Sequence, residues 1–389
     1  MTPIYLDNHA TTRVDERVVA AMLPYFSEMY GNASSRQHEF GWKAEAAVER
    51  ARAQVAALIG AQPQEIVFTS GATESINLAL KGLAENAPPG RTHLVTVVTE
   101  HSAALDSCDR LERAGFEVTR VKVDGWGLVD PDDIRRAITP RTFAVSVMTA
   151  NNEIGTIAPV GAIGSLCSES GIAFHTDATQ AAAAVPLHVG PMNIDLLSLS
   201  AHKFYGPKGV GALYVRSGIR PSPQIDGGGH ERGFRSGTLN VPGIVGLGMA
   251  AELARREGAG DAKREQELRD DFVGRLSADL EGLTVNGHPD LRLPNNASIT
   301  VEGVRADRLM LDVREVAMST GSACSSSSPR PSHVLEAIGL GPAGLASTVR
   351  FGLGRFTTRE EIEKAAECII AFVRRARAGQ MAVEIHPEQ

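Results

Sequence analysis

The sequence predicts an α/β fold, with a large domain built on a mostly parallel seven-stranded sheet and a smaller α+β domain at the C-terminal end. Three observations support this prediction. The chain has 389 residues, which is enough for two or three domains of about 150 residues each. Its composition, 43% hydrophobic and 22% charged, is that of an ordinary globular protein. Over the first two thirds, short apolar runs alternate with helical stretches, which is typical of a parallel sheet covered by helices on both faces.

The elements of the large domain follow one another along the chain in strand–helix order. Each expected strand is a short apolar run rich in β-formers, and the seven runs span residues 65–69, 93–99, 116–123, 142–149, 172–176, 196–200 and 211–215. Several expected helices begin after Ser, Thr or Asp, the residues that cap helix N-termini, and the helices span residues 36–59, 72–84, 103–114, 131–137 and 162–170.

The pattern changes after residue 241. A helix is expected over residues 244–256, Gly258 and Gly260 interrupt it, and a second helix follows over residues 263–280. The elements beyond them alternate, with strands at 296–301 and 349–352 and helices at 305–315 and 360–376. We therefore expect a boundary near residue 255, with residues 16–255 in the large domain and residues 1–15 and 256–389 in the small one.

Charge, apolar run length and cysteine spacing exclude several classes of protein. Lys and Arg number 39 against 46 Asp and Glu, giving a net charge of -7, so a basic face that binds nucleic acid is not expected. No apolar run approaches the roughly 18 residues of a membrane span, and residues 1–7 lack the features of a secretory signal, so a cytoplasmic location is expected. The four cysteines lie far apart without a CxxC pair, so neither disulfides nor a metal site is expected.

Polar groups follow directly after several expected strands, at the sheet edge where α/β proteins bind ligands. The turn Ser70-Gly71-Ala72-Thr73-Glu74 opens a helix whose first N–H groups suit a phosphate, although an ordinary helix cap also explains it. His101 follows another strand, where a single histidine is most often structural. Asp177 and Lys203 close two later strands and form either a salt bridge or part of a pyridoxal phosphate site, which needs a Schiff-base lysine and an acid beside the ring nitrogen.

The joint arrangement of these groups favours pyridoxal phosphate over a nucleotide. The glycine-rich stretch Gly206-Pro207-Lys208-Gly209-Val210-Gly211 precedes a strand instead of opening a helix after one. No GxxxxGK[ST] motif occurs anywhere in the chain. We therefore reject dinucleotide-binding and P-loop folds.

At these residues the sequence resembles the NifS/IscS-like cysteine desulfurases, a branch of the class V aminotransferase group of pyridoxal phosphate enzymes with fold type I. The resemblance spans nearly the whole chain. It rests on ordered motifs, which are Tyr5-Leu6-Asp7-Asn8, Ala10-Thr11-Thr12, Gly31-Asn32-Ala33-Ser34-Ser35, Phe68-Thr69-Ser70-Gly71-Ala72-Thr73-Glu74, Thr99-Glu100-His101, Asn151-Asn152-Glu153-Ile154-Gly155, His175-Thr176-Asp177-Ala178-Thr179-Gln180, Ser200-Ala201-His202-Lys203, Gly227-Gly228-Gly229-His230-Glu231, Arg235-Ser236-Gly237-Thr238 and Gly321-Ser322-Ala323-Cys324.

The resemblance implies a role for each residue of the expected site. Lys203 looks like the Schiff-base lysine and Asp177 like the partner of the pyridine nitrogen, as the strand ends also suggest. The other implied roles are ring stacking by His101, contacts to the phenolic oxygen side by Asn152 and Gln180, phosphate binding by Ala72, Thr73, Ser200 and His202, and a contact to the cofactor by Thr238 from the second subunit of a homodimer. Arg350 matches the arginine that holds the substrate carboxylate, and Asn32 a supporting contact to it.

Cys324 is the residue that separates the cysteine desulfurases from ordinary aminotransferases. The resemblance implies that L-cysteine becomes L-alanine while Cys324 takes the sulfur as a persulfide, for delivery to iron–sulfur assembly or tRNA-thiolation proteins. The serines and the Pro-Arg-Pro segment that follow Cys324 predict an exposed, mobile loop. Cys108, Cys167 and Cys368 lie on expected helices and are interpreted as packing residues.

Departures from the family pattern leave alternatives open. His9 and Arg13 stand where the family commonly has other residues, and residues 380–389 do not resemble the tail that housekeeping members use against scaffold proteins. A selenocysteine lyase or another class V aminotransferase would keep Lys203 and Asp177 without depending on Cys324. A catalytically silent sulfur-relay subunit would keep the fold without binding the cofactor, and the intact Lys203 and Asp177 argue against that alternative.

Overall fold

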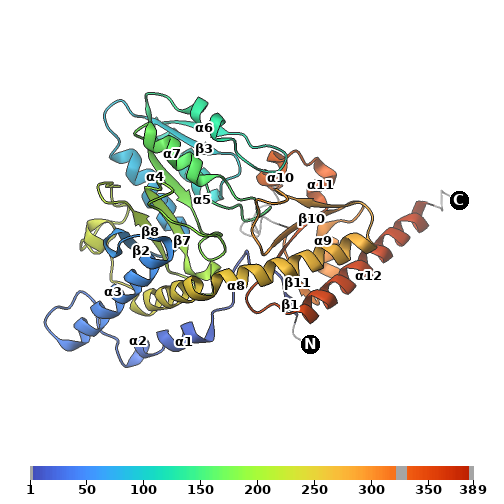
Figure 1. Ribbon diagram of the computed structural model, residues 1–389, viewed down its shortest axis with the longest axis horizontal. Helices are drawn as coiled ribbons and strands as arrows, with labels where there is room; N and C mark the ends of the chain where they lie inside the picture. Colours follow the sequence, from blue (N-terminus) through green and yellow to red (C-terminus); the bar gives the residue numbers. More distant parts are fainter. Residues whose placement is uncertain (1–2, 321–330, 385–389) are drawn as a thin grey trace.

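The computed structural model describes residues 3–320 and 331–384, and its largest element is a seven-stranded sheet with order β2-β8-β7-β6-β5-β3-β4 (Figure 1). The strands are β2 (Ile66–Thr69), β3 (His93–Val97), β4 (Glu117–Val121), β5 (Thr142–Ser146), β6 (Ala173–Asp177), β7 (Leu196–Ser200) and β8 (Gly211–Val215). Only β8 is antiparallel to its neighbours. The predicted mostly parallel sheet is confirmed, and six strands end at the same edge.

Helices cover both faces of this sheet because successive side chains of each strand point to opposite faces. In β2, Ile66 and Phe68 pack into the cluster that includes α3 and α8, whereas Val67 packs against α4. The helices of the large sheet are α1 (Glu16–Met22), α2 (Pro24–Ser27), α3 (Glu39–Ile59), α4 (Ala72–Glu85), α5 (Ser102–Arg113), α6 (Pro131–Ala137) and α7 (Val160–Glu169). The connections after β2, β3, β4, β5 and β6 thus return the chain to the edge where the next parallel strand starts, whereas β7 is followed by the antiparallel β8.

A second group of elements surrounds a three-stranded antiparallel sheet with order β12-β10-β9. Its strands are β9 (Leu283–Asn286), β10 (Asn296–Val301) and β12 (Thr348–Gly352), and β1 (Ile4–Tyr5) pairs with β11 (Val316–Ala317) beside them. Its helices are α9 (Ala306–Asp312), α10 (His333–Ala337), α11 (Pro342–Ala346) and α12 (Arg359–Glu384). Phe272 and Phe351 meet edge to face in its core, with ring centroids 5.0 Å apart. The N-terminal strand therefore lies beside C-terminal strands, and the division into domains stays a prediction.

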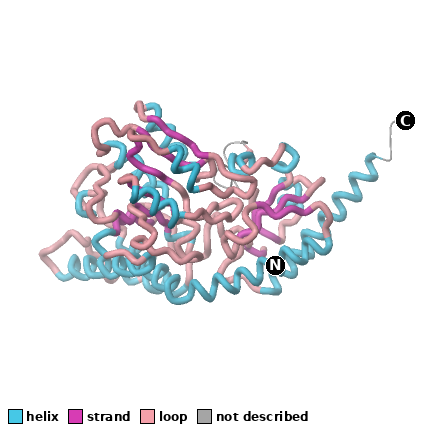
Figure 2. Tube along the Cα trace, turned by 45° about the horizontal axis from the view of Figure 1, so that its top comes forward, coloured by secondary structure: helices cyan, strands magenta, loops and turns pink. Residues whose placement is uncertain are grey.

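One helix, α8 (Val241–Asp279), spans both groups of elements without interruption (Figures 1 and 2). The predicted break at Gly258 and Gly260 is wrong. Gly258 is buried, and a Cβ at this position would lie 2.7 Å from the carbonyl oxygen of Ala183. This glycine lets the helix approach another segment closely, and packing of α8 against α3 offsets the weak helix propensity of glycine.

Candidate active site

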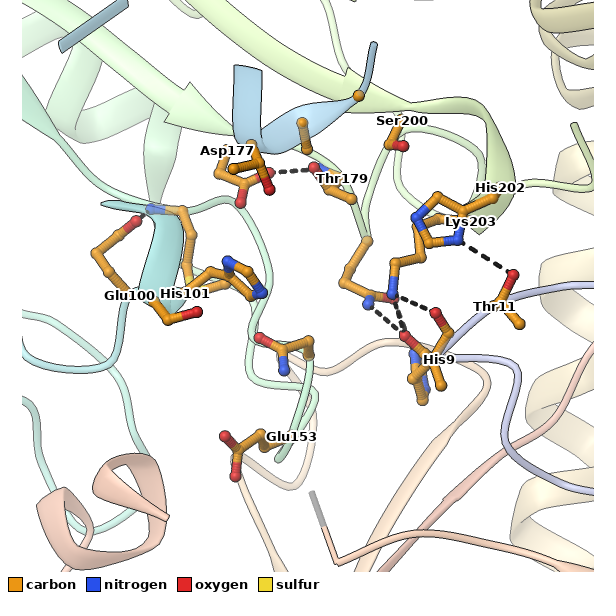
Figure 3. A pocket seen from close by; sticks show the side chains of 18 of the residues that line it. His9, Thr11, Glu100, His101, Glu153, Asp177, Thr179, Ser200, His202 and Lys203 are labelled. Carbon is orange, nitrogen blue, oxygen red and sulfur yellow. Dashed lines mark hydrogen bonds between the residues drawn. The ribbon is translucent and has the colours of Figure 1, made fainter. Parts of the chain in front are cut away.

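A cavity of about 920 Å³ opens at the carboxyl edge of the large sheet (Figure 3). Ten of the residues predicted from the sequence line it, namely Ala72, Thr73, His101, Asn152, Asp177, Gln180, Ser200, His202, Lys203 and Arg350. They come from the ends of four strands, from the loop after β5 and from β12. Residues more than 250 positions apart in the chain thus share one cavity because the strands end at one edge.

Lys203 and Asp177 come from the adjacent parallel strands β7 and β6. Asp177 is the last residue of β6, is 5% exposed, and accepts a 2.9 Å hydrogen bond at Oδ1 from the backbone N–H of Thr179. Lys203 ends a short 3₁₀ turn after β7, and its Nζ donates to the carbonyl oxygens of His9 at 2.5 Å and Ala10 at 2.8 Å. The amine therefore projects from a rigid strand end, oriented by the N-terminal segment.

The first turn of α4 is the part of the cavity suited to a phosphate. Gly71 precedes the helix with φ of 153°, and no side chain among the described residues caps it. A Cβ at Gly71 would lie 3.5 Å from Ser200 Oγ, so the turn and that hydroxyl are close neighbours. N–H groups at a helix N-terminus bind anions, and Ser200 adds a hydroxyl donor.

His202 also lines the cavity, as a neutral imidazole. Its Nδ1 lies 3.1 Å from the Thr11 hydroxyl. Burial, together with the positive charges of Lys203 and Lys208, lowers the pKa of His202 to about 4. The ring can therefore act as a hydrogen-bond partner of an anion without contributing a charge of its own near neutral pH.

His101 and Glu100 follow β3 on the side of the cavity near Asp177 (Figure 3). His101 caps α5, with Nδ1 accepting from the Ala103 N–H at 3.1 Å, so the neutral ring carries its proton on Nε2. Glu100 is fully buried and accepts from the Met148 N–H at 2.5 Å. Burial and the nearby charge of Asp177 raise the pKa of Glu100 well above its usual value, which favours the neutral acid.

Arg350 reaches the cavity from β12 and is only 2% exposed. Its Nη1 donates to the Asn152 carbonyl oxygen at 2.8 Å and its Nη2 to Asp7 Oδ1 at 3.0 Å. Arg355 instead pairs with Asp15 and Asp261 away from this cavity. Of these two arginines, Arg350 is therefore in position to bind a carboxylate in the cavity.

Several polar residues of the cavity were not assigned from the sequence. His9 lies beside Lys203, and Glu153 accepts a 2.5 Å hydrogen bond from Ser332. His333 contacts the Glu100 carbonyl oxygen through Nε2 at 2.9 Å. His9 was visible in the sequence only as an unusual residue inside a motif, whereas nothing local singled out Ser332 or His333.

Three predicted residues do not line the described cavity. Asn32 is exposed and accepts from the Ser34 N–H, and Thr238 is also exposed. Cys324 lies outside the described residues. The other three cysteines are packing residues as predicted, since Cys108 and Cys167 are buried in apolar clusters and Cys368 packs against one. Burial raises the pKa of Cys108 and Cys167 to about 12, which makes them poor nucleophiles.

Neither a metal centre nor a membrane span is found in residues 3–320 and 331–384. No group of three or more His, Cys, Asp or Glu side chains there could hold a metal ion. None of the helices in this part of the chain combines the length and apolarity needed to cross a membrane.

Comparisons with known proteins match nearly the whole chain. The model of the family described as aminotransferase class-V matches residues 4–365. A curated relative, cysteine desulfurase IscS of Anaeromyxobacter sp. (strain Fw109-5), is 54% identical over 377 residues, which cover 96% of this chain and 93% of the relative. Cysteine desulfurase IscS of Rickettsia rickettsii (strain Iowa) is 47% identical over 378 residues, covering 97% of this chain and 92% of the relative.

Solved structures give the same match. A NifS-like protein superposes with a TM-score of 0.90 at 37% identity, covering 96% of this chain and 100% of that structure. A structure described as SspA in complex with cysteine superposes with a TM-score of 0.80 at 38% identity, covering 91% of this chain and 99% of that structure.

Proposed function

The chain belongs to the class-V aminotransferase family. From this membership and from the cavity around Lys203, we propose which residues carry out the conversion of L-cysteine to L-alanine. The protein is a pyridoxal-phosphate-dependent cysteine desulfurase, which converts L-cysteine to L-alanine and passes the sulfur to an acceptor. The observation that supports the assignment of residues is that Lys203, Asp177 and the first turn of α4 meet at one cavity with Arg350.

The residues of the cavity fit pyridoxal phosphate. The first turn of α4, Ser200 and His202 would hold the phosphate, Asp177 would face the ring nitrogen, and Lys203 would hold the cofactor covalently. His101, Asn152 and Gln180 would contact the ring and its phenolic oxygen. When bound, the cofactor withdraws electrons from the substrate and so makes its Cα–H and Cβ–S bonds breakable.

Each protein group then has one task. The Arg350 guanidinium binds the substrate carboxylate and so fixes which substrate bond faces Lys203. Lys203 Nζ removes and returns the Cα proton, and the carbonyl oxygens of His9 and Ala10 keep the amine directed into the cavity. His101, with its proton on Nε2 when neutral, moves a proton to or from the departing sulfur.

We infer that Cys324 is the sulfur acceptor within the chain. Its thiolate attacks the substrate sulfur, an S–S bond forms, the Cβ–S bond breaks and a proton completes the alanine methyl group. Net, one thiol and one L-cysteine give one persulfide and one L-alanine, so no external oxidant is needed. Support comes from the described residues around the segment, because the Ser319 backbone pairs with that of Arg350 and Ser332 lines the cavity.

A homodimer completes the proposal. Large apolar side chains between residues 23 and 42 are exposed, and an interface with a second subunit would remove them from water; they are Leu23, Phe26, Tyr30, Phe40 and Trp42. Thr238, exposed and outside its own cavity, would contact the cofactor phosphate of the partner subunit. Delivery of the persulfide to iron–sulfur or tRNA-thiolation proteins and a cytoplasmic location also belong to this proposal.

The experiment is turnover of L-cysteine by the cofactor-loaded protein in the presence of a reductant, with alanine and sulfide both measured. Wild type should form alanine, and Cys324→Ala should form none while it keeps the visible absorption of the bound cofactor. Alanine from both proteins would overturn the role of Cys324 and direct attention to selenocysteine as substrate. Absence of alanine from both would contradict the assignment of the reaction.

A further inference from the structure

His9 contacts two of the residues predicted to bind the cofactor, although nothing in the sequence gave it a role. Its side chain and backbone both contact Gln180, since Nδ1 lies 2.9 Å from Gln180 Oε1 and the carbonyl oxygen accepts from Gln180 Nε2 at 3.0 Å. The same carbonyl oxygen accepts from Lys203 Nζ. His9 is 2% exposed, so these contacts are made in a buried site.

The two contacts determine which ring nitrogen of His9 carries the proton. A carbonyl oxygen can only accept, so the Gln180 atom beside the His9 backbone oxygen must be the NH₂ group. The Gln180 oxygen therefore faces Nδ1, and Nδ1 must be the nitrogen that carries hydrogen. Reversing the Gln180 amide would place its oxygen against the His9 carbonyl oxygen, so that two acceptors would face each other. It would also remove the acceptor of the Nδ1–H group.

The His9 ring is buried and neutral, and its N–H group already has a partner. Burial lowers the pKa of His9 to about 3, and the positive charges of Arg350 and Lys203 contribute. The ring is therefore neutral near neutral pH, and the hydrogen on Nδ1 is used by Gln180. Gln180 has two amide protons and gives one to the His9 backbone, which leaves one for a ligand in the cavity it lines.

We propose that His9 is a positioning residue, whose ring N–H holds the Gln180 amide so that an N–H group, and not the carbonyl oxygen, faces the phenolic oxygen of the cofactor. This inference rests on the proposed function. Every residue at position 9 would supply the backbone oxygen. The N–H group that contacts the Gln180 oxygen, in contrast, comes from the side chain and is lost when the side chain has no ring or amide N–H. The buried amide oxygen of Gln180 would lose its donor without it.

The expected effects follow from the loss of one neutral hydrogen bond. His9→Ala should weaken the affinity of the apo-protein for pyridoxal phosphate about fivefold. It should also raise the pH midpoint of the visible absorption band by about 0.7. Without the N–H donor of Gln180, the phenolic oxygen of the cofactor attracts the neighbouring proton more strongly, so that proton is lost only at higher pH. His9→Asn should restore both values to near wild type, since its side-chain NH₂ lies about where Nδ1 lies.

The test is a double-mutant cycle with Gln180→Ala, read by cofactor affinity and by the spectral pH midpoint. If His9 acts through Gln180, His9→Ala should change neither value in the Gln180→Ala background. An equal effect of His9→Ala in both backgrounds, or no effect in either, would overturn the inference. Circular dichroism and thermal melting identify a variant that fails to fold, and His9→Asn still tests the inference in that case.

The same measurements separate this inference from the function on which it rests. A wild-type protein without a visible band that depends on Lys203 would contradict the proposed cofactor site itself. A wild-type protein with that band, but with a His9→Ala variant indistinguishable from it in affinity and pH midpoint, would contradict only the role of His9.

Discussion

Two polar regions of this protein share Lys203 and Gln180 in their walls but differ in the space that they enclose. The first is the cavity of about 920 Å³ at the carboxyl edge of the sheet. The second, which we call the junction, consists of Tyr205, Asp261, Glu265 and Arg355, which line a space of about 30 Å³, together with Asp15, which pairs with Arg355. Both contain buried ionisable groups, so burial alone does not distinguish them.

The contacts explain why only the cavity is a candidate for chemistry. In the junction, Arg355 pairs with Asp261 at 2.8 Å and with Asp15 at 3.0 Å, and it stacks on the Tyr205 ring. The Tyr205 hydroxyl donates to Glu265 at 3.1 Å. These groups satisfy one another and leave no room for a substrate. Perturbed ionisable groups therefore indicate an active site only where space for a ligand adjoins them.

The largest effect that would test this comparison is expected at Lys203. Lys203→Ala should abolish the visible absorption of the bound cofactor and lower turnover by about 10⁴-fold or more, because both the covalent attachment and the proton-transfer group are lost. Absorption spectra and alanine formation measure the two losses. Lys208→Ala is the matched control, since Lys208 also lines the cavity but is exposed, and it should keep most of the activity. Full turnover by Lys203→Ala would contradict the assignment.

Arg350 lines the cavity and Arg355 lies in the junction, so substitutions of these two arginines give a second test of the comparison. Arg350→Lys loses the forked donor pair for the substrate carboxylate and should raise KM for L-cysteine about 10- to 100-fold. Arg355→Lys should leave KM unchanged and lower the free energy of unfolding by about 1–3 kcal/mol. Steady-state kinetics and denaturant unfolding of both variants measure this, and a rise in KM for Arg355→Lys alone would reverse the comparison.

Glu265 makes the junction sensitive to pH. Burial raises its pKa to about 7, so between about pH 4.5 and 7 the folded protein keeps a proton that the unfolded chain has released. The contribution of this group to stability is therefore complete below about pH 4.5 and is lost as the pH rises through 7, by about 3 kcal/mol. His9 contributes with the opposite sign, because its lowered pKa makes stability rise with pH up to about 6.5.

Glu265→Gln isolates this contribution, since the amide resembles the protonated acid and can still accept from Tyr205. Urea unfolding at pH 5 and pH 8 should show the variant close to wild type at pH 5 and more stable than wild type at pH 8. A difference between the two proteins that does not change with pH would show that Glu265 does not titrate in this range.

The sequence predicted elements whose signals are local. Helix α6 and strands β7, β8 and β10 have the predicted bounds, because Asp130 and Pro131 begin the helix and each strand is a short apolar run. The positions of Asp177 and Lys203 were also predictable, since each follows a strand and parallel strands end at one edge. Their roles toward a cofactor came from family resemblance and not from the pattern.

What could not be predicted depends on contacts between distant parts of the chain. The role inferred for His9 depends on Gln180, which lies 171 residues away. The continuity of α8 depends on its packing against α3 and Ala183, whereas local propensity favours a break at its glycines. Local patterns locate the groups at strand ends, and only the fold shows what orients them.

The smallest effect concerns those two glycines of α8, which local propensity treats alike and the fold does not. Gly260→Ala should stabilise the protein by up to about 1 kcal/mol, because a Cβ there meets no described atom within 4 Å and alanine favours the helix. Gly258→Ala gains the same propensity, but its Cβ would lie 2.7 Å from the Ala183 carbonyl oxygen, so the helix must shift. We expect a net loss of about 1 kcal/mol, measured by thermal or urea unfolding. Stabilisation by both substitutions would mean that α8 does not need its close contact with the Ala183 carbonyl oxygen. Gly258 would then only lower the helix propensity of α8, as the sequence alone suggested.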